Sequence, residues 1–170
     1  GAVDRLAGFV DLAAPAPAFA VAFYPFCGFD LDGERLATPL LFLLGEADDW
    51  TPPGPCLRQA EAWAAAGQPV EAEIYADAPH GFDSRLWFDF TVDRAITVRR
   101  TDPACTLTVD AGGASVVVEG EGDVSSLESR RAFLARCGER GVTFGADGAA
   151  RRAAFERIDA FLDRVLGPAG

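Results

Sequence analysis

The sequence contains no methionine, lysine or asparagine, and it has one histidine, His80, among 170 residues. Acidic residues outnumber basic residues by 26 to 15, which gives a net charge of −11. Because binding to phosphates requires clustered Lys and Arg, this charge argues against nucleic acid or an anionic membrane as a partner. No apolar run approaches the roughly 20 residues of a membrane span, and no signal peptide opens the chain.

The first residues indicate that this chain is part of a longer protein. Residues 3–12 have apolar side chains at i, i+3, i+4 and i+7, the spacing of an amphipathic helix. No Ser, Thr, Asp or Asn precedes them to cap that helix. We therefore expect an upstream half, which would carry any targeting signal.

The next segments predict an α/β fold. Residues 19–26 and 39–46 are continuous apolar runs, typical of strands buried on both faces, and residues 70–78 alternate as a strand nearer a sheet edge does. Residues 54–68 between them have helical spacing, with an apolar face made by Leu57, Ala60 and Ala64. A strand, helix and strand at this spacing predict a right-handed parallel crossover, and hence a mostly parallel sheet flanked by helices.

The second half of the chain follows a different pattern. Residues 84–90 predict an aromatic loop or short helix, and residues 97–119 predict a small hairpin outside the main sheet. Helices are expected over 126–138 and 147–166. The apolar stripe of the last helix is Phe155, Ile158, Leu162 and Val165. Without repeats or low-complexity segments, residues 1–170 are predicted to form a single domain.

Two polar side chains follow neighbouring strands. Asp48 comes after the second strand, in "GEADDWTPP", and His80 comes after the third, in "APHGF". The carboxyl ends of parallel strands form the crevice where open α/β sheets bind ligands, so these side chains are expected to meet. An Asp followed by a His in this order matches the acid and base of a Ser/Cys–His–Asp triad.

Two other readings of these residues remain open. His80 is structural in the first, and Asp48 and Asp49 cap the helix that follows. In the second, the cluster binds a metal through mixed oxygen and imidazole ligands. Its members would be Glu46, Asp48, Asp49, His80 and Asp83. No His or Cys pair at metal-ligand spacing supports that second reading, and we predict no metal and no other cofactor.

Three motifs together resemble the C-terminal half of the dienelactone hydrolase family, α/β-hydrolases that act on esters and lactones. They are "FYPFCGFD", "TPLLFLLGEADDWTPPGPC" and "VEAEIYADAPHGFD", within residues 19–83, and "GVTFGADGAARRAAFERIDAFL" is similar to the family's closing helix. The resemblance implies a partial α/β-hydrolase fold in which Asp48 is the triad acid and His80 the triad histidine. The family's G-x-[CS]-x-G nucleophile elbow has no match here.

The nucleophile is expected upstream of Gly1. In α/β-hydrolases it precedes the acid, whereas every serine here follows His80. The serines are Ser84, Ser115, Ser125, Ser126 and Ser129. Cys27 is upstream, but Pro25 stands where the elbow requires glycine, which makes Cys27 a poor candidate. Gly1 would be the last glycine of the elbow.

The four cysteines allow three pairings. Cys27 and Cys56 each follow a strand of the crossover closely, so both are expected at the same rim of the sheet, and they are the preferred disulfide. Such a bond would favour a periplasmic or secreted protein. The alternative is a cytosolic protein with four reduced, buried thiols.

Aromatic residues and a strand edge complete the expected site. Trp50 and Phe82 neighbour the proposed catalytic residues and are predicted to wall an apolar substrate pocket.

By the resemblance, the strand over 19–26 lacks the neighbouring strand that leads into the elbow, and an exposed edge of this kind attracts another strand. We expect it to pair with the protein's own N-terminal half, to pair with a second copy, or to aggregate.

The sequence therefore predicts a carboxylic-ester or lactone hydrolase that acts on a small molecule. Asp48 and His80 would belong to its triad, and the chain alone would be inactive for want of a nucleophile. The alternative is a non-catalytic binding or assembly module that keeps the α/β-hydrolase scaffold.

Overall fold

The computed structural model describes residues 17–28, 35–86, 88–98, 105, 107–109, 116–118, 122–123 and 126–167. The helix expected over residues 3–12 and the aromatic residue Trp87 lie outside this set. Contacts divide the chain into two compact units, which we describe separately. The sheet unit comprises Ala16–Cys27, Arg35–Val92 and Val142–Gly170, and the described part of the other unit lies almost wholly within Asp93–Gly141.

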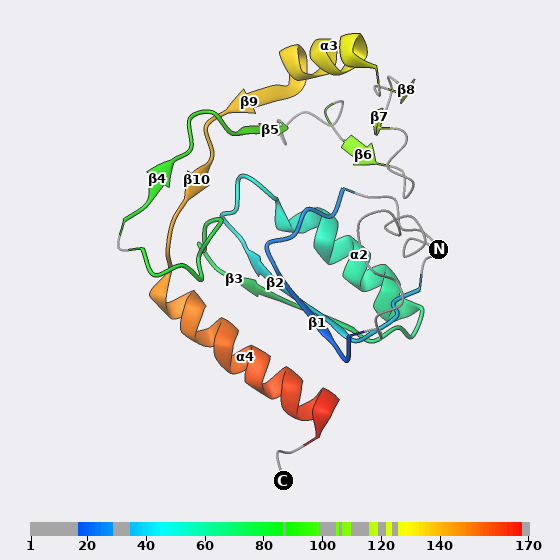
Figure 1. Cartoon of the computed structure of the whole chain (residues 1–170), viewed down its shortest axis with the longest axis vertical. Coiled ribbons are helices and arrows are strands. Elements are labelled where there is room, and N and C mark those ends of the chain that lie inside the picture. The colour runs from blue at the N-terminus through cyan, green and yellow to red at the C-terminus, as the bar shows by residue number, and fades with distance from the viewer. Residues whose placement is uncertain are drawn as a thin grey trace. The chain divides into compact units, whose positions relative to one another are not determined.

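A parallel sheet forms the centre of the sheet unit (Figure 1). Its strands are β1 (Ala20–Phe23), β2 (Leu40–Gly45) and β3 (Val70–Tyr75), in the order β1-β2-β3. Helix α2 (Pro53–Ala65) connects β2 to β3, so the predicted parallel crossover is present. The fold class is α/β.

The two faces of β2 pack against different helices. Leu41 and Leu43 point to one face, where they form a core with buried residues of α4 (Gly148–Leu166). Phe42 points to the other face and stacks on Trp63 of α2, with ring centroids 6.5 Å apart. Because side chains of a strand alternate between the faces of a sheet, one helix covers each side of this strand (Figure 1).

Helix α2 buries a different face from the one predicted. Cys56, Ala60 and Trp63 are buried, whereas Ala64 is exposed. Trp63 has far more apolar surface to bury than Ala64, and Cys56 is held in a disulfide. Because these two side chains are buried, the buried face of the helix is shifted by about one residue from the predicted face, from Leu57 to Cys56 and from Ala64 to Trp63.

Helix α4 begins at an aspartate cap. The Asp147 carboxylate accepts hydrogen bonds from the backbone N–H groups of Ala149 and Ala150, at 2.8 and 3.0 Å. Of the predicted stripe, Ile158, Leu162 and Val165 pack against the core, whereas Phe155 is 44% exposed. The deepest aromatic of α4 is Phe161, which is 1% exposed.

Charged residues join α4 to the edge strand β3. Arg157 hydrogen-bonds to Glu71 and Glu73, and Arg164 Nη2 lies 2.7 Å from a carboxylate oxygen of Glu71. Burial by itself would raise the pKa of Glu71, but the hydrogen bonds and charges of Arg157 and Arg164 together outweigh it and hold that pKa below its ordinary value.

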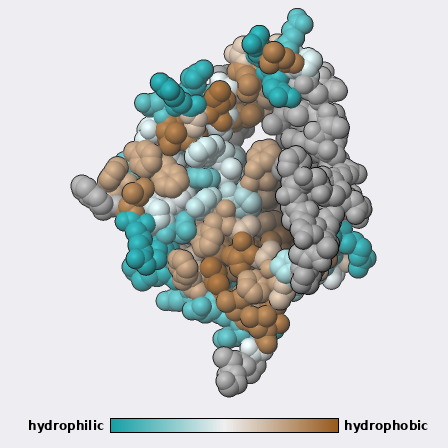
Figure 2. Space-filling view, in the orientation of Figure 1, coloured by the Kyte–Doolittle hydropathy of each residue, from teal (hydrophilic) through white to brown (hydrophobic). Residues whose placement is uncertain are grey.

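Apolar side chains gather between β1 and α4 on the face shown in Figure 2. Partly buried residues of both elements, and one residue just before β1, contribute to them. They are Phe19, Val21, Phe23, Leu162 and Val165. Among the described strands, β1 pairs only with β2, so this apolar surface borders an edge of the described sheet.

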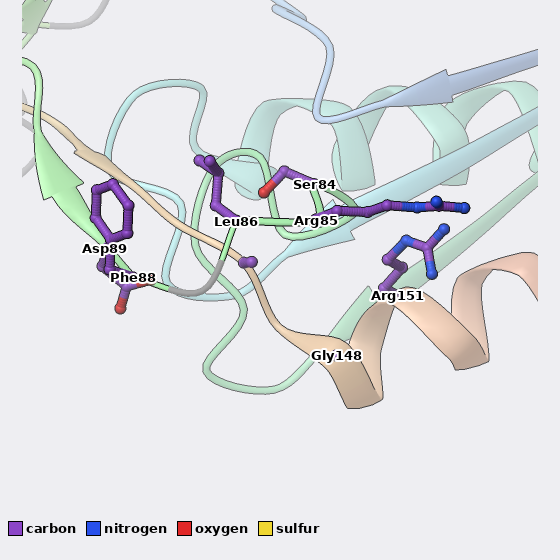
Figure 3. Close-up of a pocket in the computed structure, with 8 residues that line it drawn as sticks. Ser84, Arg85, Leu86, Phe88, Asp89, Gly148 and Arg151 are labelled. Carbon is purple, nitrogen blue, oxygen red and sulfur yellow. The ribbon is translucent and has the colours of Figure 1, made fainter.

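A cavity of about 440 Å³ adjoins the first turn of α4 (Figure 3). Its walls come from that turn and from the segment after His80. The lining residues are Ser84, Arg85, Leu86, Phe88, Asp89, Ala146, Gly148 and Arg151.

A two-stranded antiparallel ribbon also belongs to the sheet unit. It consists of β4 (Phe90–Thr91) and β10 (Thr143–Phe144), with Phe144 opposite Phe90. The ribbon brings a segment close to the C-terminal helix alongside His80, because Phe144 also forms a parallel bridge with His80.

The second unit contains short antiparallel strands and one helix. Strand β5 (Ile96–Val98) pairs with β9 (Gly138–Arg140), and α3 (Leu127–Cys137) precedes β9. The strands β6 (Leu107–Val109), β7 (Val116–Val118) and β8 (Gly122–Asp123) form an antiparallel sheet. The β6–β7 pair lies within the hairpin predicted over 97–119.

A disulfide joins Cys105 to Cys137 in this second unit and packs with the buried Phe133. Within the described ranges of the whole chain, no helix has the length and hydropathy that a membrane span requires.

Candidate active site

The loops that follow β2 and β3 meet at the carboxyl end of the sheet. Gly45 and Tyr75 are opposite each other in the parallel register, and the Ala47 N–H donates to the Ala78 carbonyl at 3.1 Å. A Cβ on Gly45 would lie 2.3 Å from that carbonyl oxygen. Glycine is therefore required at position 45 for the two loops to approach this closely.

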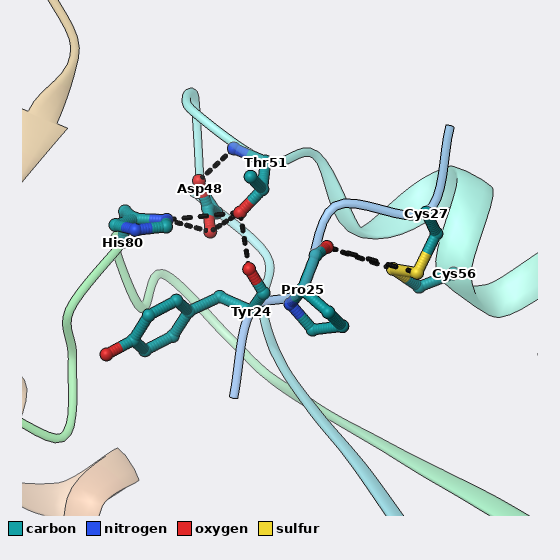
Figure 4. The surroundings of a disulfide bond; sticks show 7 residues. All are labelled: Tyr24, Pro25, Cys27, Asp48, Thr51, Cys56 and His80. Carbon is teal, nitrogen blue, oxygen red and sulfur yellow. Dashed lines mark hydrogen bonds and ion pairs between the residues drawn. A yellow bond between two sulfur atoms is a disulfide. The ribbon is translucent and has the colours of Figure 1, made fainter. Parts of the chain in front are cut away.

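This approach brings Asp48 and His80 together. Asp48 Oδ2 lies 2.9 Å from His80 Nδ1 (Figure 4). Asp48 is 0% exposed, and the His80 side chain is 12% exposed. The two residues that the sequence assigns to an acid–base pair thus form a direct, largely buried contact.

Several donors satisfy the Asp48 carboxylate. Its Oδ1 accepts from the backbone N–H groups of Trp50 and Thr51, at 2.9 and 2.8 Å. Its Oδ2 lies 3.0 Å from the Thr51 hydroxyl and also contacts His80. A buried carboxylate is stable only with such partners.

The turn formed by Asp48 precedes α2. The N-cap of this helix is Pro52, which has no side-chain hydrogen bond, so Asp48 does not cap the helix.

The surroundings of Nδ1 define which ring nitrogen carries the proton. Nδ1 faces Asp48 Oδ2, an acceptor, and Thr51 Oγ1 at 3.1 Å. The single hydroxyl proton of Thr51 has another acceptor, the Tyr24 carbonyl, at 2.7 Å. The proton between Asp48 and His80 therefore belongs to Nδ1, which leaves Nε2 of the neutral ring as the base. Nε2 forms no hydrogen bond with any residue that the structure describes.

Aromatic rings surround the imidazole. The centroids of Tyr24, Trp50 and Phe144 lie 4.3, 4.8 and 5.9 Å from that of His80. Trp50 thus lies beside the imidazole. These three rings restrict the movement of the histidine.

Phe82 is not part of such a wall. It is 0% exposed and belongs to the hydrophobic core with Leu41, Tyr75 and Phe161. The preceding residue, Gly81, has a φ of 80°, a conformation that favours glycine. This turn directs the Phe82 side chain inward, so the predicted contact between Phe82 and substrate is corrected to a core position.

Tyr24 contributes a second polar link. Its hydroxyl donates to Asp83 Oδ1 at 2.9 Å, and its backbone has a φ of 36°, which is rare for a non-glycine residue. Burial, together with the hydrogen bond to Asp83, raises the pKa of the Tyr24 hydroxyl well above its ordinary value. Asp83 thus pairs with Tyr24.

A disulfide between Cys27 and Cys56 closes the same end of the sheet (Figure 4). It is the pair that the sequence favours. It joins the segment after β1 to the first turn of α2, close to the Tyr24–Thr51 hydrogen bond. Cys27 therefore has no free thiol in this structure, which argues further against its use as a nucleophile.

The other carboxylates near His80 have separate partners. Asp49 accepts from the backbone N–H and the hydroxyl of Thr143, at 2.8 and 3.0 Å. Glu46 accepts from the Asp77 N–H at 3.4 Å. No group of three or more potential metal ligands occurs among the described residues, so the structure gives no support to the alternative reading of Glu46, Asp48, Asp49, His80 and Asp83 as a metal site.

Three contributors to the site were missed by the sequence analysis: Tyr24, Thr51 and Thr143. Thr51 lies in the "DDWTPP" motif and bonds to Asp48 locally, so its position in that motif was a usable signal. Tyr24 and Thr143 are distant from His80 in the sequence and carry no local signal. The cavity in Figure 3 does not include Asp48, Trp50 or His80 among its lining residues.

The fold and the site define an α/β protein with a buried Asp–His pair at the carboxyl end of its parallel sheet. No protein-family model, curated protein or solved structure matches this chain.

Replacement of Gly45 by alanine is expected to disrupt the site. The new methyl group would overlap the Ala78 carbonyl, at 2.3 Å, and separate the loops that carry Asp48 and His80. The matched control is Gly148→Ala in the first turn of α4, where a Cβ would meet the Arg152 side chain at an ordinary 3.7 Å. Urea unfolding should show a loss of stability for Gly45→Ala and little change for Gly148→Ala. Equal stabilities of Gly45→Ala and the unaltered protein would contradict the close approach of the two loops.

Both tyrosines of the chain are expected to ionise late. Burial, and after it the charge of Glu73, raises the pKa of Tyr75 to about 12, and the pKa of Tyr24 is raised further. Because folding favours the neutral phenols, their contribution to stability is complete below about pH 10 and is lost as the pH rises through the folded-state pKa values. Absorbance at 295 nm, followed with circular dichroism, should show ionisation coupled to alkaline unfolding. Ionisation of both residues near pH 10 in the folded protein would refute this.

Proposed function

We propose that this chain is part of a carboxylic-ester or lactone hydrolase of the dienelactone hydrolase type. In this proposal it has a partial α/β-hydrolase fold and supplies the Asp and His of a Ser/Cys–His–Asp triad. The observation that carries the proposal is the 2.9 Å contact between Asp48 Oδ2 and His80 Nδ1, formed by loops at the carboxyl ends of adjacent parallel strands.

The proposed roles follow from the tautomer of the imidazole. His80 Nε2 takes the proton of a hydroxyl or thiol nucleophile as that group attacks the ester carbonyl, and returns it to the leaving group. Asp48 keeps the proton on Nδ1 and stabilises the imidazolium that forms. In the second half of the reaction, His80 Nε2 takes a proton from water as the water attacks the acyl group, and gives it to the departing oxygen or sulfur of the nucleophile.

The nucleophile of this proposal comes from outside the described residues. Cys27 and Cys56 are bonded to each other, and the buried Ser84 hydroxyl has no hydrogen-bond partner, so it is not bonded to His80. The substrate is a small ester or lactone, and the mechanism uses no cofactor.

The proposed partner of β1 is a further strand, either from the protein's own N-terminal half or from a second copy. Two features support it: the edge of β1 that no described strand pairs with, and the apolar side chains beside it (Figure 2).

One observation favours a second candidate, a non-catalytic binding or assembly module with the same scaffold. Within the described part of the chain, no hydroxyl or thiol hydrogen-bonds to His80 Nε2. An enzyme needs that group, whereas a module does not, so turnover separates the two candidates.

Hydrolysis of p-nitrophenyl acetate by the natural full-length protein tests the proposal. His80→Ala is expected to lower kcat by about 10⁴-fold or more, because the nucleophile loses its base. The control Asp159→Asn, an exposed position on α4, should leave kcat unchanged. The present chain alone should show no turnover that depends on His80.

Two results would contradict this account. A full-length His80→Ala variant with the wild-type rate would exclude the proposed hydrolase mechanism. Loss of activity on His80→Ala in the present chain alone would show that the nucleophile lies within it.

A further inference from the structure

We propose that Asp49 is a positioning residue for His80. It would hold strand β10 against the backbone of His80, while its neighbour Asp48 holds the imidazole ring. This proposal rests on the proposed function for its catalytic meaning, but the geometry it describes is measurable without turnover.

The first step is the contact between Asp49 and Thr143. Both carboxylate oxygens take part: Oδ1 accepts from the Thr143 N–H at 2.8 Å, and Oδ2 accepts from the Thr143 hydroxyl at 3.0 Å. Hydrogen bonds to an ionised acceptor are stronger than neutral ones. Asp49 thus fixes both the backbone and the side chain of the first residue of β10.

The second step leads from β10 to His80. Phe144 forms a parallel bridge with His80, and the Gly145 N–H donates to the His80 carbonyl at 3.0 Å. The Asp147 N–H donates to the Phe82 carbonyl, also at 3.0 Å. The segment that Asp49 anchors therefore runs along the histidine loop.

The third step is the tight packing at this junction. A Cβ on Gly81 would lie 2.3 Å from the Phe144 ring, so the ring lies directly on the backbone after His80. The Phe144 ring also contacts the imidazole, with 5.9 Å between centroids. Because this packing leaves no free space, a shift of β10 must move His80.

The neighbouring carboxylates of Asp48 and Asp49 therefore position different parts of His80. Asp48 bonds to the ring directly, and Asp49 acts on the backbone through Thr143 and Phe144. No hydrogen bond joins Asp49 to His80 itself. Other bonds beside β10, such as Val92 N–H to the carbonyl of Val142 just before this strand at 2.9 Å, remain when Asp49 is replaced, so the fold is expected to survive.

Nuclear magnetic resonance of the imidazole nitrogens tests this proposal, because the single histidine needs no assignment. In this chain, Asp49→Ala should reduce the population of the Nδ1–H tautomer and remove the low-field Nδ1–H signal, although Asp48 is unchanged. Asp49→Asn keeps the acceptor for the Thr143 N–H and should restore most of the signal. Thr143→Val, which removes only the hydroxyl, should have an intermediate effect.

The control is Asp159→Asn on the exposed side of α4, which makes the same change of charge and should leave the His80 signals unaltered. Circular dichroism checks the fold of each variant. If Asp49→Ala does not fold, Thr143→Val decides the outcome. Unchanged His80 signals in whichever of Asp49→Ala and Thr143→Val folds would overturn the proposal.

Turnover of the full-length protein supplies the second readout. Asp49→Ala is expected to lower kcat on the order of 100-fold with little change in KM, since a displaced base misaligns the reaction without removing substrate contacts. Altered His80 signals without turnover in any form, wild type included, would refute the hydrolase function and leave the positioning role intact. Unaltered signals would refute the positioning role alone.

Discussion

The site depends on the close approach of two loops that leave adjacent parallel strands. The β2–β3 register sets Gly45 beside Tyr75, and the absence of a side chain on Gly45 lets the Ala78 carbonyl oxygen lie only 2.3 Å from the position a Cβ would take. The chain past these points carries Asp48 on one loop and His80 on the other. A bulkier residue at position 45 would separate the carboxylate from the ring, and the remaining contacts of the site would lose their geometry.

Burial of Asp48 has a cost that the surrounding donors offset. A carboxylate removed from water requires hydrogen bonds, and here the backbone of Trp50 and Thr51 and the imidazole supply them. The same set of bonds fixes the tautomer of His80. Thr51 links this network to the Tyr24 carbonyl, close to the Cys27–Cys56 disulfide, so the segments after β1, β2 and β3 are all joined around one imidazole.

The features that follow from topology could be predicted from the sequence. Continuous apolar runs located β1 and β2 and an alternating run located β3, each within a few residues, and the rule that parallel strands end at one edge placed Asp48 near His80. The same rule favoured the Cys27–Cys56 pair.

Features that depend on local backbone angles, on side-chain size or on contacts between distant residues could not be predicted. Phe82 enters the core because Gly81 has a positive φ, and the Tyr24 carbonyl reaches Thr51 in a residue whose own φ is 36°. Helix α2 is rotated by the size of Trp63 and by a disulfide, neither of which enters a count of apolar positions. The contact of Asp49 with Thr143 joins residues 94 apart in sequence and has no local signature.

The central claim is that Asp48 holds the proton on Nδ1 of His80 and leaves Nε2 as a base. Determining the tautomer of the neutral imidazole tests this claim most directly. In ¹⁵N-labelled protein, the account predicts a protonated Nδ1 and an unprotonated Nε2. In Asp48→Asn it predicts the reverse, because the amide donates to Nδ1. A neutral ring protonated on Nε2 in the unaltered protein would contradict the account.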